Sequence, residues 1–488
     1  MNLPRIIQGG MGASISNWRL ARAVSSSGHL GVVSGTALDA VLARRLQLGD
    51  IGGHMRRALS SLPVPGVAER ILDRYFVEGG KDAETPFKPS PIPVLEPSVR
   101  SLELTVAANF VEVFLAKEGH DGQVGINYLE KIQLPTLPSL HGALLAGVSC
   151  VIMGAGIPRS IPGVMESLSK GEACELTVPV SGAAGERLAM RYDPGVLFRG
   201  EAPTTAKPAF FPIVSSVPLA NMLMRKASGP VDGFIVEAPT AGGHNAPPRG
   251  APTFDEKGQP VYGERDEVDP AQMAALGLPF WLAGGQARPD SLAKAMAVGA
   301  QGIQVGTAFA FCEESGMDPT IRRSVLARVR DKASSNPPRV HTSAKASPTG
   351  FPFKVLPHAD TMSLETKADR PPLCDLSYLR LAHRMDDGKV VWRCPSEPLG
   401  DYVKKGGEEV DAVGRLCVCN GLMATAGYPQ TRKDGYHELP LITSGDGLPE
   451  VERFLRADGS DYTAADVLES LGGSRLTEVE AEAAALLA

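Results

Sequence analysis

A histidine that follows two glycines is the residue of this sequence best suited to chemistry. His244 stands after Gly242 and Gly243, in a loop that begins where the apolar run 231–236 ends. Glycines let a flat or anionic group approach the backbone closely, because they carry no Cβ atom. An imidazole at such a place can exchange a proton near neutral pH. The alternative is a loop histidine bonded to a neighbouring carbonyl group. The active-site interpretation is favoured because other loops of the chain also carry glycines after apolar runs.

The residues on either side of this histidine carry two further expectations. Glu237 closes the apolar run and could be a second acid–base group, but a carboxylate at the end of a strand also accepts hydrogen bonds from loop N–H groups. We expect that structural role for Glu237. After the histidine, the sequence HNAPPRG predicts a proline-stiffened lip that carries Arg249 at the substrate entrance.

Short apolar runs, most of them ending in glycine, alternate with helical patterns along the first 330 residues. The runs are 5–8, 30–33, 123–128, 150–153, 174–180, 210–214, 231–236, 280–283 and 303–305. About eight such units predict an α/β protein with a TIM-type (β/α)8 barrel, whose usual size is about 250 residues plus insertions. A doubly wound open sheet shares the alternation, but it needs one dominant GxGxxG motif after its first strand. GGMGAS at 9–14 lacks that spacing, so the barrel is favoured.

Two parts of the chain depart from this alternation. Residues 38–119 are helical and loop-like, with a proline-rich segment at 88–97, and predict an insertion in the barrel. The barrel is expected to span residues 1–333, insertion included. Residues 334–488 are expected to form a C-terminal extension of mixed or irregular structure.

The extension contains a segment with four cysteines, which are Cys374, Cys394, Cys417 and Cys419. Four thiolates are the right number for tetrahedral zinc or an iron–sulfur cluster, so the segment is a candidate metal site. The spacing is irregular, whereas zinc ribbons pair their cysteines as CxxC. Packing of free cysteines as small apolar residues is the alternative.

The composition of the 488 residues is that of a globular protein, with 43% apolar and 21% charged residues. The net charge is −6 and the chain has no basic block, so nucleic acid and anionic membranes are poor partners.

The N-terminus lacks the layout of a signal peptide, and no apolar run is long enough to span a bilayer. With seven cysteines, an odd number, we expect a cytoplasmic protein with reduced thiols. The oligomeric state stays open, a homo-oligomer included.

Seven short motifs together resemble the FMN-dependent nitronate monooxygenase family, formerly called 2-nitropropane dioxygenases. They are IIQGGMG at 6–12, HLGVVSG at 29–35, VGIN at 124–127, GAG at 154–156, EAPTAGGH at 237–244, LAGG at 282–285 and QVGTAFAF at 304–311. Each motif alone is weak, whereas their order and spacing are fairly specific. The related FMN-dependent enoyl-acyl-carrier-protein reductases share the barrel. The chain departs from the family after His244, where members commonly carry a glycine two residues later.

The resemblance implies FMN as cofactor and His244 as the active-site histidine over the flavin ring. It implies that the flavin lies along Gly10, Met11 and Asn127. It further implies that the ribityl chain and phosphate are held by Gly243, Gly284, Gly285, Gln304, Val305, Gly306 and Thr307. The expectation is physically reasonable, because loops after the last two strands of such barrels expose backbone N–H groups to a phosphate.

The activity implied by the resemblance is that of an FMN-dependent oxidoreductase that oxidises a nitronate-like or related small substrate with oxygen. The alternative on the same barrel is an NAD(P)H-dependent enoyl or quinone reductase, with acyl groups on an acyl carrier protein or CoA and NAD(P)H as reductant. A third possibility is a non-catalytic flavin-binding partner subunit. The presence of His244 argues for an enzyme.

Overall fold

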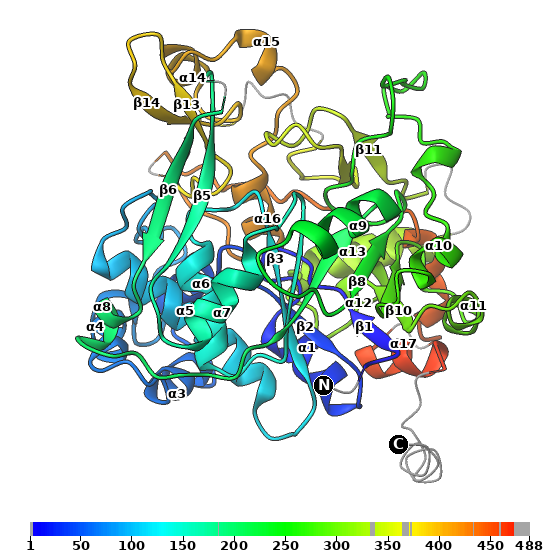
Figure 1. The fold of residues 1–488 in the computed structure, drawn as a ribbon, viewed down its shortest axis with the longest axis horizontal. Coiled ribbons are helices and arrows are strands. Elements are labelled where there is room, and N and C mark those ends of the chain that lie inside the picture. The colour runs from blue at the N-terminus through cyan, green and yellow to red at the C-terminus, as the bar shows by residue number, and fades with distance from the viewer. Residues whose placement is uncertain are drawn as a thin grey trace.

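The computed structural model describes residues 3–183, 185–331, 337–363, 370, 373–432, 434–457 and 460–472. Its centre is a sheet of eight parallel strands, ordered β1-β10-β9-β8-β7-β4-β3-β2 (Figure 1). The strands are β1 (Ile6–Gln8), β2 (Gly31–Ser34), β3 (Val124–Leu129), β4 (Cys150–Gly154), β7 (Ala209–Val214), β8 (Phe234–Glu237), β9 (Phe280–Ala283) and β10 (Gly302–Val305).

The two end strands of this sheet meet and close it. Gln8 N–H donates to the Leu30 carbonyl over 2.9 Å, and Leu30 N–H donates to the Ile6 carbonyl over 3.1 Å. The interior is filled by buried side chains from successive strands, among them Ile152, Phe211 and Trp281. A closed parallel sheet with a packed interior is a TIM-type barrel, so the predicted fold is confirmed.

Helices follow the strands and surround the barrel. They are α1 (Trp18–Ser26), α5 (Val99–Lys117), α6 (Thr136–Leu145), α7 (Ile161–Ser169), α9 (Val217–Lys226), α10 (Pro270–Ala274), α11 (Ser291–Ala297), α12 (Thr307–Ala310) and α13 (Pro319–Arg330). The segment expected as a helical insertion lies between β2 and β3. Besides α5, it contains α2 (Leu38–Gln47), α3 (His54–Ser60) and α4 (Val67–Tyr75).

The apolar run at 174–180 is not a barrel strand, and that expectation is wrong. It forms β5 (Cys174–Ser181) in a second sheet of order β14-β13-β5-β6, which Figure 1 shows projecting from the barrel. Only alternate residues of β5 are buried, namely Leu176, Val178 and Val180. Strands of a parallel barrel are buried on both faces, whereas β5 exposes one face and lies in a mixed sheet, antiparallel to β6 and parallel to β13. The other strands are β6 (Arg187–Tyr192), β13 (Leu381–Arg384) and β14 (Val390–Arg393).

The C-terminal extension folds back over the barrel. Its remaining elements are β11 (His341–Ser343), β12 (Phe353–Val355), α14 (Leu399–Lys404), α15 (Glu409–Ala412), α16 (Val418–Thr425), the 3-10 helix η2 (Leu448–Phe454) and α17 (Ala464–Ser470). Two short helices stand elsewhere, α8 (Gly195–Phe198) and the 3-10 helix η1 (Glu264–Asp266). The extension is tied to the helical insertion, because the Tyr378 hydroxyl donates to Asp39 over 2.5 Å and the Arg44 guanidinium donates to the Tyr428 carbonyl over 2.6 Å.

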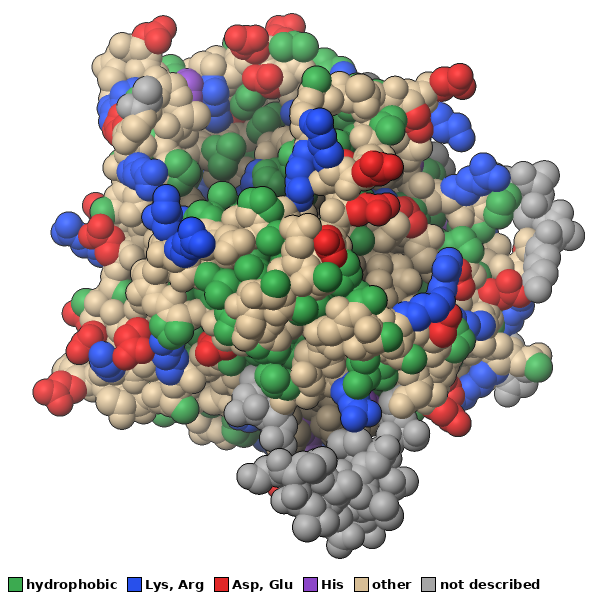
Figure 2. All heavy atoms as spheres, turned by 45° about the vertical axis from the view of Figure 1, so that its right-hand side comes forward, with side chains coloured by type: hydrophobic (Ala, Val, Ile, Leu, Met, Phe, Trp, Pro, Cys, Tyr) green, Lys and Arg blue, Asp and Glu red, His purple; other side chains and the backbone are tan. Residues whose placement is uncertain are grey.

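The surface carries charges of both signs. On the face drawn in Figure 2, acidic and basic side chains are interspersed, and hydrophobic side chains gather toward its middle. Within the described part of the chain, no helix combines the length and the apolar character that crossing a bilayer requires.

Candidate functional site

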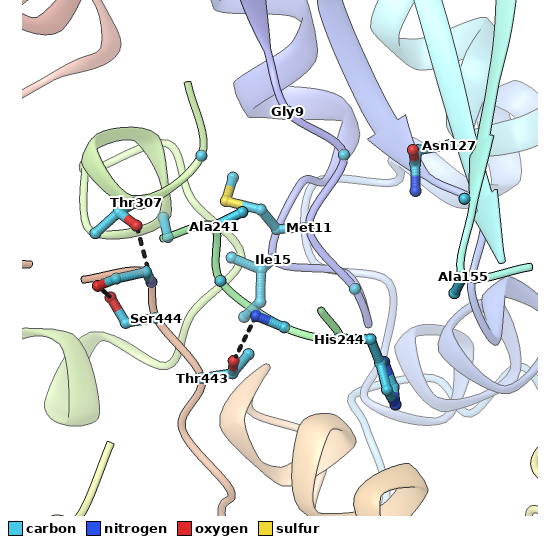
Figure 3. A pocket seen from close by; sticks show the side chains of 18 of the residues that line it. Gly9, Met11, Ile15, Asn127, Ala155, Ala241, His244, Thr307, Thr443 and Ser444 are labelled. Carbon is cyan, nitrogen blue, oxygen red and sulfur yellow. Dashed lines mark hydrogen bonds between the residues drawn. The ribbon is translucent and has the colours of Figure 1, made fainter. Parts of the chain in front are cut away.

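One pocket lies among the loops at the carboxyl ends of the barrel strands. All eleven residues expected at a flavin site line it: Gly10, Met11, Asn127, Gly243, His244, Gly284, Gly285, Gln304, Val305, Gly306 and Thr307. In Figure 3, Thr307 and Ser444 lie at one end of the pocket, His244 and Ala155 lie at the other, and Met11 and Ile15 lie between them. The residues expected near a phosphate and the residue expected near the reacting atoms are thus well separated, as an elongated cofactor requires.

Two features of the barrel residues suit a polar, flat cofactor. The Gln304 side-chain oxygen is buried without a hydrogen-bond partner among the described residues, so it offers an acceptor to an N–H or O–H group in the pocket. Gly10 lets the loop after β1 lie against β3, because a Cβ there would stand 2.3 Å from the Asn127 Cβ. FMN carries ring N–H and ribityl hydroxyl donors, and the residues present fit it.

The opposite end of the pocket is built from glycines and hydroxyl groups. Gly284 and Gly285 have φ values of +91° and +66°, which favour glycine, and they turn the loop after β9. The Thr307 hydroxyl oxygen accepts a hydrogen bond from Gly445 N–H over 3.0 Å, which leaves its own O–H free to donate into the pocket. This end fits the phosphate group of a mononucleotide.

His244 is held by side chains of the extension. Its Nε2 atom lies 2.7 Å from the Ser347 hydroxyl oxygen, and its ring packs against the ring of Phe353 with centroids 4.7 Å apart. Burial and, to a smaller extent, the nearby ammonium of Lys131 lower the pKa of His244 to about 4. The imidazole is therefore neutral at physiological pH. Nδ1 has no hydrogen-bond partner among the described residues, so it is the ring atom left for a substrate.

The backbone of the histidine loop is also paired with the extension. Lys354 N–H donates to the Gly243 carbonyl, and Asn245 N–H donates to the Pro352 carbonyl, each over 2.9 Å, so β12 continues as a strand beside the loop. Gly243 N–H donates to the Thr443 hydroxyl over 3.0 Å (Figure 3). These bonds fix the position at which His244 enters the pocket.

The extension supplies one wall of the pocket as well, and the sequence did not predict it. The wall residues are Phe353, Tyr378, Leu379, Val418, Cys419, Leu422, Thr425, Thr443, Ser444, Gly445 and Gly447. They come from β12, α16 and the loops around them, more than 100 residues after His244. Apart from Cys419, which the sequence marks only as a candidate metal ligand, no motif marks these segments, and Ser347 stands in a polar stretch without periodicity.

The structure lends no support to the four-cysteine metal site that the sequence predicts. Among the residues that the structure describes, no three histidine, cysteine, aspartate or glutamate side chains are grouped so that they could hold a metal ion. Burial raises the pKa of the Cys394 thiol to about 12 and that of Cys419 far above its ordinary value. Cys417 accepts a hydrogen bond from Asn420, and Cys374 contacts the Ser377 hydroxyl. These contacts are consistent with the packing of free cysteines as small apolar residues.

Two expectations about the loop after β8 are also corrected. The Glu237 carboxyl group accepts no loop N–H among the described residues; it lines the pocket, and burial raises its pKa to about 8. Arg249 and Pro247 do not line the central pocket. Arg249 instead donates to the Ser215 carbonyl, and its own N–H donates to Asp266 over 2.9 Å, so the lip is folded away beside the site.

Comparison with known proteins gives a family for part of the chain. Residues 201–341 match the family model described as nitronate monooxygenase. A protein of Bacillus subtilis (strain 168) named "Probable nitronate monooxygenase" is 33% identical over 96 residues, which are 20% of this chain and 26% of that relative's length. The matched part thus spans about a quarter of that curated relative.

Three solved structures resemble the chain at low identity. FabK from Thermotoga maritima is 17% identical with a TM-score of 0.45, and the alignment covers 99% of this chain and 96% of that one. A nitroalkane oxidase from Streptomyces ansochromogenes is 15% identical with a TM-score of 0.42, over 100% and 99%. The enoyl reductase domain of MlnA from Bacillus amyloliquefaciens is 10% identical with a TM-score of 0.45, over 99% and 96%.

The matched residues 201–341 contain β7 to β10, the His244 loop and both glycine loops at the far end of the pocket. The family match therefore falls on the part of the chain that supplies eight of the eleven residues expected at the flavin site. The resemblance drawn from the sequence motifs is thus supported by a family model, and over residues 201–341 the chain is similar to the nitronate monooxygenase family.

Proposed function

We propose that the chain is an FMN-dependent oxidoreductase of the nitronate monooxygenase type, which oxidises a nitronate-like or related small substrate with oxygen. The observation that carries this proposal is the meeting of all eleven expected residues in one pocket, with a neutral histidine at one end and glycine loops at the other. Bound FMN would supply the electron transfer that no side chain can perform.

The chain's own residues would bind and orient the reactants. Gly10, Met11 and Asn127 would lie along the flavin, Gln304 would accept one of its hydrogen bonds, and the loops with Gly285 and Thr307 would take the phosphate. The extension would close the pocket against water, since Phe353 and α16 form its outer wall.

A neutral His244 suits hydrogen bonding to a substrate oxygen. If the Ser347 hydroxyl donates to Nε2, the proton of the neutral ring is on Nδ1, which can then donate to a nitro or carbonyl oxygen. Thr349 N–H donates to the Ser347 oxygen over 3.2 Å and so helps to orient that hydroxyl. We propose that His244 stabilises negative charge on the substrate in this way.

The apolar wall favours one alternative substrate. Leu379, Val418 and Leu422 give the pocket a surface suited to an alkyl or acyl chain. An enoyl reductase with NAD(P)H as reductant, acting on acyl groups carried by CoA or an acyl carrier protein, would use such a surface. The same wall would hold the alkyl part of a nitronate.

One experiment separates these functions. The purified protein is expected to be yellow, and acid should release FMN rather than FAD. Under anaerobic conditions, a nitronate should change the flavin absorbance of a monooxygenase, NADPH should bleach that of a reductase, and neither should affect a binding module. Recovery of FAD, or a colourless protein that takes up no added FMN, would contradict the assignment of the pocket residues to FMN.

Ser347→Ala is expected to lower kcat by up to about tenfold while leaving the flavin bound. The change removes one buried hydrogen bond to His244 Nε2, and such a bond contributes about 0.5–1.5 kcal/mol. Ser347→Thr keeps the hydroxyl and serves as the matched variant. Steady-state rates normalised to flavin absorbance give the answer, and equal kcat in all three proteins would show that Ser347 does not position His244.

A further inference from the structure

Glu237 lies between two cavities at the carboxyl end of β8. Its side chain lines the central pocket and also a small cavity on the other side of the histidine loop. Its carboxyl group has no hydrogen-bond partner among the described residues. Glu237 is half-buried, and a carboxyl group that lines two cavities is placed to exchange a proton with groups or water in either one.

The small cavity has the size and lining of a water site. Its volume is about 20 Å³, enough for one water molecule. Asn245 lines it, and the side-chain oxygen of this residue is buried without a hydrogen-bond partner in the described structure. Tyr262 and Asp266 lie in the same lining. A water molecule there would meet Glu237 on one side and several polar groups on the other.

The ionisable groups around Glu237 leave it protonated at neutral pH. Burial alone raises its pKa to about 8. The groups that face it are Tyr262, Arg249 and Asp266 across the small cavity and the neutral His244 in the central pocket. Arg249 is engaged with the Ser215 carbonyl, and β7 and β9 present apolar residues where they flank β8. No cation among these groups is placed to hold Glu237 ionised.

We propose that Glu237 is a proton-transfer residue that connects the central pocket, through water in the small cavity, with the solvent. Its O–H bond breaks as the proton passes to a basic atom in the pocket, the carboxylate then takes a proton from the cavity water, and that water is reprotonated from solvent. No electron moves, and the net change is one proton delivered from solvent. The inference rests on the proposed function, because an oxidoreductase exchanges protons as it transfers electrons.

The test uses the flavin-loaded enzyme and two variants. Glu237→Gln preserves the size of the side chain but cannot supply the proton. Glu130→Gln is the matched control, because burial also raises the pKa of Glu130, yet Glu130 lines a separate groove and is absent from the central pocket. The first readout is infrared: the carbonyl band of a protonated carboxyl group should be present in the wild type at neutral pH, disappear as pH rises through about 8, and be missing from Glu237→Gln.

The second readout is the pH dependence of kcat. The wild type should lose activity above about pH 8, and Glu237→Gln should lower kcat by about 10²-fold and remove that limb, with flavin absorbance unchanged. Glu237→Asp should restore part of the rate, and Glu130→Gln should match the wild type. An unchanged limb in Glu237→Gln, or an ionised Glu237 at neutral pH in the infrared spectra, would overturn the relay. A wild type that turns over neither a nitronate nor NADPH would instead count against the proposed function, and the infrared result would still decide the state of Glu237.

Discussion

Replacement of His244 by alanine is expected to give a folded, yellow protein whose kcat is lowered by about 10²–10⁴-fold. The flavin contacts are assigned to Gly10, Asn127 and the glycine loops, which the change leaves in place. The lost group is the neutral imidazole whose Nδ1 is available to the substrate. Its loss removes stabilisation that is needed only when charge develops on the substrate, so the effect should fall on kcat.

Steady-state rates normalised to bound flavin measure this effect. His437→Ala is the matched control, because His437 is an exposed histidine of the extension that does not line the pocket. A His244→Ala protein with nearly full kcat would exclude His244 from the chemistry. A folded protein without flavin would make it a cofactor-binding residue instead. Because the pKa of His244 is near 4, the wild-type kcat should show no inflection from this group between pH 6 and 8.

The barrel and its share of the site could be predicted because both depend on local patterns. An apolar run followed by a glycine turn describes a buried strand and the loop at its carboxyl end, and parallel strands bring those loops to one face. The run at 174–180 shows the limit of this pattern. Its composition resembles that of a barrel strand, and only the exposure of Glu175 and Pro179 in the folded chain reveals a sheet with one free face.

The rest of the site could not be predicted because it depends on contacts between distant segments. Ser347 reaches His244 across 103 residues, and Thr443 reaches Gly243 across 200. Neither segment carries a motif or a periodic pattern, and their positions are set by tertiary packing alone. The cysteines show a related limit, since their proximity in sequence predicts a metal site, whereas no grouping of three possible ligands is found among the described residues.

These contacts make the extension a part of the site rather than an appendage. β12 pairs with the histidine loop, α16 forms the outer wall, and Gly445 bonds to Thr307 at the far end of the pocket. The extension must therefore be folded in place for the pocket to exist. Activity is therefore expected to depend on the stability of the extension.

A buried cluster of charges joins distant segments of the extension to one another. The Glu438 carboxyl group is fully buried and accepts two hydrogen bonds from the Arg370 guanidinium, over 2.7 and 2.8 Å. It also accepts from Arg432, which in turn donates to Asp375 over 2.8 Å. Asn420 on α16 donates to the same Asp375 over 2.8 Å, so the cluster reaches the wall of the pocket.

Glu438→Ala is expected to destabilise the protein by about 3–5 kcal/mol, because it leaves the Arg370 guanidinium buried without its carboxylate. Equilibrium urea unfolding, followed by flavin fluorescence and by circular dichroism, measures the change. Glu175→Ala is the matched control: Glu175 pairs with Arg191 over 3.0 Å at an exposed site, where an ion pair contributes about 0–1 kcal/mol. Because the cluster bonds to α16, flavin should be released at the same urea concentration at which the extension unfolds. Equal stability of the two variants would show that the cluster does not stabilise the extension. Release of flavin well after the extension unfolds would show that the pocket survives without this wall.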